Sequence, residues 1–138
     1  MLLTAIAGPI SNVVLAILGM LLFAASTHVA VQYPEAFQSA GLVLEVFIKM
    51  NLALAIFNMI PIPPLDGSRV LNYFMPRSLQ PAWQQFEEYS FYILMGLLLF
   101  LQYRNISILD GPIAWAFEAL WRLALPLMAS WTQITPAA

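Results

Sequence analysis

Cysteine, histidine and charged residues are scarce in this chain of 138 residues. It has no cysteine, one histidine and only 9% charged residues, with five Lys and Arg against seven Asp and Glu. The lack of cysteine excludes disulfides and thiolate metal sites, and the net charge of -2 argues against binding to nucleic acid. Soluble domains have about a quarter charged residues, whereas 62% of this chain is hydrophobic. The composition therefore predicts a small integral membrane protein embedded in the lipid bilayer.

Four apolar stretches predict an all-α membrane domain that takes up the whole of residues 1–138. About 20 apolar residues cross a bilayer, so we expect three to four hydrophobic helices, at approximately 2–27, 41–60, 86–103 and 112–131. The third stretch is short and crosses only if the bilayer thins locally. Three prolines follow the second stretch and predict a helix broken at its end, because proline lacks an N–H and disfavours helix in the residue before it: Pro61, Pro63 and Pro64.

The few charged residues give the expected orientation and two expected ion pairs. The 65–88 loop contains two arginines and the 28–40 loop has no Lys or Arg, so the positive-inside rule places 65–88 in the cytoplasm, with the plasma membrane as the expected location. Oppositely charged side chains four residues apart on a helix form ion pairs. The sequence contains two such pairs, Glu45 with Lys49 and Glu118 with Arg122.

The segment from Asn58 to Gly67 combines an amide, a carboxylate and a broken helix at the end of an apolar stretch. Ionisable groups at membrane depth are candidate functional groups, and irregular backbone there is buried in protein or lines a wet cavity. The same residues also fit a simple turn in which Asp66 caps a short helix from Ser68 to Phe74. Composition alone favours the cap, and both interpretations stay open at this point.

The string N-x-x-P-x-P-P-L-D-G in this segment resembles the signature of the site-2 protease family of intramembrane zinc metalloproteases. The run from Ala7 to Asn12 resembles that family's A-G-P-x-x-N segment. The resemblance implies a Zn²⁺ cofactor, with Asp66 as a zinc ligand and Asn58 as the catalytic amide that binds the substrate backbone and stabilises the oxyanion. It also implies a transmembrane or membrane-adjacent protein substrate. Candidates for the substrate cleft are Asn51, Pro61, Pro63, Pro64, Leu65 and Gly67.

The family's other motif, H-E-x-x-H, supplies two zinc-binding histidines and a general base, and it is absent from this sequence. His28 has no second ligand beside it, and the expected topology places it across the membrane from Asp66, so we expect an interfacial residue. Only Met1 to Ile6 precede Ala7. We therefore expect the C-terminal portion of a zinc endopeptidase, inactive alone because one carboxylate cannot hold catalytic zinc.

Two other hypotheses stay open. The first is a pseudoprotease or membrane scaffold that keeps the fold and binds client helices in the former cleft. The second is an unrelated small membrane protein, such as a transporter subunit that uses its broken helix as an ion site.

Overall fold

The computed structural model describes residues 2–27, 30 and 32–134, and its regular structure in this part is entirely helical. Five helices follow one another along the chain: α1 (Leu2–Ser26), α2 (Pro34–Asn58), α3 (Asp66–Phe74), α4 (Gln80–Tyr103) and α5 (Asp110–Ile134). The prediction of an all-α domain is confirmed. His28 lies outside the described residues, so its expected interfacial position stays a prediction.

Three of the long helices begin earlier than the apolar stretches predict. Helix α2 begins at residue 34 instead of 41, α4 at 80 instead of 86 and α5 at 110 instead of 112. Each has a proline in its first turn, where a missing N–H costs nothing because no helical acceptor precedes it: Pro34, Pro81 and Pro112. A prediction from apolar residues alone places the start of each helix too late, because the first turn is polar. The connector before α2 is therefore shorter than predicted.

Helices α1 and α2 are long and apolar enough to cross a membrane, with candidate spans Leu3–Ser26 and Pro34–Asn58. Within the described residues no other helix meets the same measure of length and hydropathy. Large apolar side chains on both helices are bare, among them Leu3 at 85% and Val43 at 68% exposure. A contiguous apolar surface of this kind suits contact with lipid rather than water.

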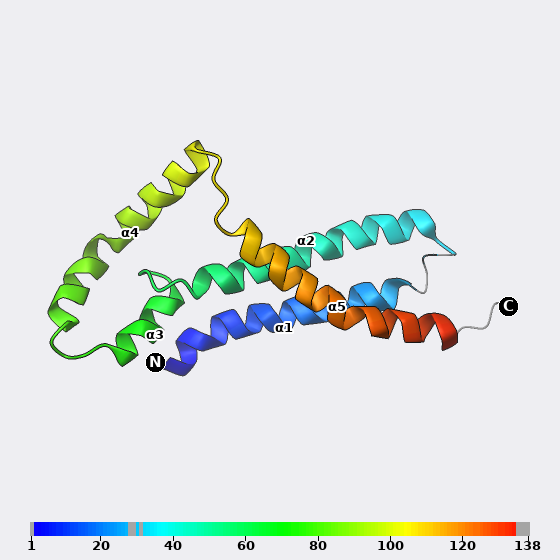
Figure 1. Cartoon of the computed structure of the whole chain (residues 1–138), viewed down its shortest axis with the longest axis horizontal. Helices are drawn as coiled ribbons and strands as arrows, with labels where there is room; N and C mark the ends of the chain where they lie inside the picture. The colour runs from blue at the N-terminus through cyan, green and yellow to red at the C-terminus, as the bar shows by residue number, and fades with distance from the viewer. Residues whose placement is uncertain (1, 28–29, 31, 135–138) are drawn as a thin grey trace.

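The core lies where α1 and α2 pack against each other and α5 crosses them (Figure 1). Its buried residues are Ala16, Met20, Ile48, Leu52 and Ala124. Small residues allow the helices to approach closely: a Cβ at Gly19 would lie 2.9 Å from the side chains of Phe47 and Ile48. Helix α3 packs on α1, whereas α4 projects away from the other helices.

Both predicted ion pairs are confirmed. The Lys49 ammonium contacts the Glu45 carboxylate, and Arg122 lies 3.6 Å from Glu118. Lys49 Nζ also lies 5.0 Å from the ring centre of Phe117 on α5. This cation–π contact joins α2 to α5, because the negative face of the aromatic ring attracts the ammonium group. A pattern within one helix could not predict it.

Candidate metal centre

The two principal candidate residues flank one loop. Asn58 is the last residue of α2 and Asp66 is the first residue of α3. The Met59 N–H still bonds to the Ala55 carbonyl at 3.2 Å, but Pro61 has no N–H with which to continue the helix. The predicted break at the end of the second apolar stretch is therefore confirmed.

Asp66 does not cap α3, so that interpretation of the segment is wrong. The N-cap residue is Leu65, with no hydrogen bond from a capping side chain, and Asp66 belongs to the first turn of the helix. The Ser68 hydroxyl donates to the Leu65 carbonyl at 2.6 Å. The helix begins two residues earlier than expected, and this leaves the Asp66 carboxylate free of a capping role.

Gly67 closes the loop at its base. A Cβ at this position would overlap the carbonyl oxygen of Met59 and would lie 2.6 Å from that of Ile60. Met59 directly follows Asn58, and Gly67 directly follows Asp66. The close backbone approach therefore holds the candidate amide and the candidate carboxylate at the same end of the bundle.

Replacing Gly67 by alanine is expected to lower the free energy of unfolding by about 1–3 kcal/mol, because the new methyl group overpacks the loop. The measurement is thermal unfolding in detergent, followed by circular dichroism. Gly96→Ala is the matched control, since a Cβ there meets nothing within 4 Å and alanine favours helix over glycine. Equal unfolding temperatures for the two variants would contradict the close approach at Gly67.

The remaining cleft candidates divide by burial. Asn51 is buried, and its side-chain Nδ2 donates to the Phe47 carbonyl at 2.8 Å. Asn51 and Asn58 are seven residues apart and so share one face of α2. The other candidates form the loop and α3: Pro63, Leu65 and Gly67 are buried, and Pro61 and Pro64 are exposed. Leu65 thus serves packing.

The donor set does not form a complete zinc site. Catalytic zinc takes three protein ligands and a water, yet no three His, Cys, Asp or Glu side chains gather anywhere among the residues that the structure describes. Within the same residues, the Asp66 carboxylate has no ion pair or hydrogen bond, and the exposed Arg69 does not bridge to it. At this loop the described residues thus offer a single unpaired carboxylate, that of Asp66, toward a metal.

An apolar groove of about 470 Å³ adjoins the loop, and sequence reasoning missed it. Phe57, Ile60 and Ile62 line it from the end of α2 and the loop. The opposite wall comes from α4 and includes Leu97, Leu98 and Leu101. The groove lies between segments that are far apart in the chain, so no linear motif could have revealed it.

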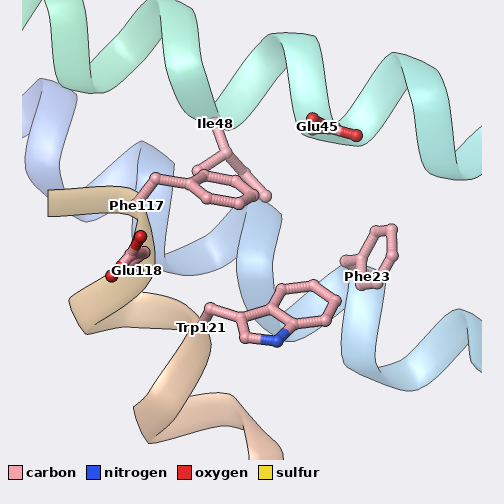
Figure 2. Close-up of a pocket in the computed structure, with 6 residues that line it drawn as sticks. All are labelled: Phe23, Glu45, Ile48, Phe117, Glu118 and Trp121. Carbon is pink, nitrogen blue, oxygen red and sulfur yellow. The ribbon is translucent and has the colours of Figure 1, made fainter. Parts of the chain in front are cut away.

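A second cavity, of about 240 Å³, lies between α1, α2 and α5 and contains none of the predicted site residues. Figure 2 shows the rings of Phe117 and Trp121 extending from α5 beneath α2. Phe23 of α1 lies at the right of the view. The two carboxylates at this cavity, Glu45 and Glu118, already pair with cations on their own helices. Its surroundings are those of a packed helix interface.

Comparison with known proteins identifies a family for the sequence that contains this loop. The sequence profile of Peptidase family M50 matches residues 28–101, more than half of the chain and including Asn58 and Asp66. The chain is 35% identical over 99 residues to "Putative zinc metalloprotease YwhC" of Bacillus subtilis (strain 168), a match that covers 70% of this chain and 45% of that protein. This chain thus spans less than half of the relative's length. No solved structure matches significantly. The chain belongs to Peptidase family M50, the site-2 protease family of membrane zinc metalloproteases.

Proposed function

We propose that this chain forms part of an intramembrane zinc metalloendopeptidase that cuts transmembrane or membrane-adjacent proteins. Family membership supports the proteolytic chemistry. The observation that carries the proposal is the backbone contact of Gly67 with Met59, which holds Asn58 and Asp66 at the base of one loop. An amide and an unpaired carboxylate at the two ends of this loop are the groups that peptide hydrolysis at zinc requires from this segment.

In this proposal Asp66 contributes one zinc ligand, and the other ligands come from an H-E-x-x-H helix outside this chain. Bound zinc supplies Lewis acidity and a water of lowered pKa. The Asn58 amide donates a hydrogen bond to the carbonyl oxygen of the scissile peptide, and the bond strengthens as negative charge develops there. We call the longer protein that contains such a helix before Ala7 the complete enzyme.

The proposed substrate is an apolar peptide segment. The groove beside Asn58 is walled by aliphatic side chains of the loop and α4, so it favours aliphatic residues over charged ones. Pro61 and Pro64 are exposed in a loop of turns and bends, so this part of the loop is accessible from outside. The exposed apolar side chains of α1 and α2 support a location in lipid, and such a segment would come from that lipid.

The proposed topology has three to four spans in the plasma membrane. Helices α1 and α2 are the candidate spans, and α4 and α5 are proposed to supply the rest. The 65–88 loop, with Arg69 and Arg77, is proposed to face the cytoplasm by the positive-inside rule. The candidate metal centre would then lie near the cytoplasmic surface.

Metal analysis of the purified 138-residue chain tests the proposal. We expect no stoichiometric zinc after dialysis and no cleavage of a membrane reporter, because a single carboxylate holds zinc too weakly. The complete enzyme, treated in parallel, is expected to retain stoichiometric zinc and to cleave the reporter. Tight zinc binding by the isolated chain would refute its proposed inactivity. A complete enzyme with neither zinc nor cleavage would instead favour the pseudoprotease or scaffold.

A further inference from the structure

The Asp66 carboxylate rests against bare backbone of α1. Its Oδ2 lies 3.1 Å from the position that a Cβ would take at Gly8, which is closer than almost all real Cβ contacts. No other atom from outside its own turn of α1 lies within 4 Å of that position. Any side chain at residue 8 would therefore press directly on the carboxylate.

The main chain of Asp66 is restrained by contacts of the residues that follow it. Gly67 is fixed against the carbonyl groups of Met59 and Ile60, and the Ser68 hydroxyl is bonded to the Leu65 carbonyl on the other side of Asp66. The Asp66 side chain is still free to rotate about its own torsion angles. A methyl group at residue 8 would thus turn the carboxylate in another direction while the loop stays in place.

We propose that Gly8 is a positioning residue for Asp66: the absence of a side chain at this point of α1 sets the direction in which the carboxylate presents its oxygens. The importance of this direction for metal binding rests on the proposed function. Groups that orient a metal ligand without touching the metal typically change metal affinity by about 10–100-fold when altered.

The first test addresses the contact itself in the 138-residue chain, which has no native cysteine. The double variant Gly8→Cys with Asp66→Cys is expected to react efficiently with a short bifunctional thiol crosslinker in lipid nanodiscs. The control is Gly19→Cys with Asp66→Cys, because residue 19 lies about 16 Å further along α1. Equal crosslinking of the two pairs would overturn the proposal.

The second test measures zinc retention by the complete enzyme during dialysis against a chelator. Gly8→Ala is expected to weaken zinc binding by about 10–100-fold, and Gly19→Ala is expected to leave it unchanged. Gly19→Ala is a stringent control, because a Cβ at Gly19 would lie 2.9 Å from the side chains of Phe47 and Ile48. It should therefore perturb helix packing at least as much as Gly8→Ala does. Unfolding temperatures are recorded for both, so that a general loss of stability is recognised.

The outcomes separate the two proposals. In one outcome Asp66→Ala loses zinc, whereas Gly8→Ala and Gly19→Ala retain it equally. This result would overturn the role of Gly8 and leave the ligand role of Asp66 intact. Zinc retained by Asp66→Ala would overturn the ligand role of Asp66 in the proposed function, whatever the crosslinking shows. Selective loss in Gly8→Ala together with selective crosslinking supports both.

Discussion

Replacing Asp66 by alanine in the complete enzyme is expected to abolish cleavage of a membrane reporter while leaving expression and membrane insertion intact. Asp66 makes no hydrogen bond or ion pair within the described residues and does not cap α3. Its removal should therefore cost the fold less than about 1 kcal/mol, the value of an acidic residue in the first turn of a helix. Activity, in contrast, would lose a metal ligand. The measurements are reporter cleavage and zinc content of the purified protein.

The matched control is Glu35→Ala. Like Asp66, Glu35 is an acid in the first turn of a helix, but it is exposed and lies at the end of α2 opposite to Asn58. It should leave cleavage and zinc content unchanged. Wild-type cleavage by Asp66→Ala would exclude the ligand role, and equal losses in both variants would indicate a general effect of surface charge.

Replacing Asn58 by alanine is expected to lower kcat by about 10²–10³-fold with little change in KM, because an amide aimed at a developing oxyanion acts mainly in the transition state. That loss corresponds to about 3 kcal/mol. Zinc content should stay at the wild-type level, since an amide at this position donates a hydrogen bond and does not bind the metal. Steady-state kinetics on a detergent-solubilised substrate measure both constants.

Asn72→Ala is the control for this substitution. Asn72 is an exposed asparagine of α3 outside the loop, and its loss should leave kcat within about twofold of the wild type, as for surface substitutions worth less than 0.5 kcal/mol. A raised KM with unchanged kcat for Asn58→Ala would assign Asn58 to ground-state binding. Loss of zinc from the same variant would show that it supports the metal centre instead.

Hydropathy and proline chemistry were enough to predict the four long helices but not the first residues of three of them. Apolar residues dominate the middle of α2 and α4, whereas their first turns are polar and resemble loop sequence. A proline in a first turn is compatible with both a loop and a helix start. The break after Asn58 was predictable, because three prolines within four residues leave no room for continued helical hydrogen bonding.

Only the part of the site that is contiguous in the sequence was predictable. The string from Asn58 to Gly67 identifies the amide and the carboxylate by resemblance, but it does not show that Gly67 packs on Met59. That contact depends on how the prolines fold the chain back. The neighbour of Asp66 on α1, Gly8, is remote in sequence, and the groove beside the loop combines α2 with α4. Both arise from tertiary packing, which hydropathy does not encode.

The junction between Gly67 and the Met59 carbonyl has a mechanical consequence. The main chain next to Asn58 packs on the main chain next to Asp66, so the end of α2 and the start of α3 are expected to move as one unit. If α2 tilts to admit a peptide from the bilayer, the hydrogen-bond donor and the carboxylate travel together. Gating motions can thus open access to the centre without changing the spacing between its parts.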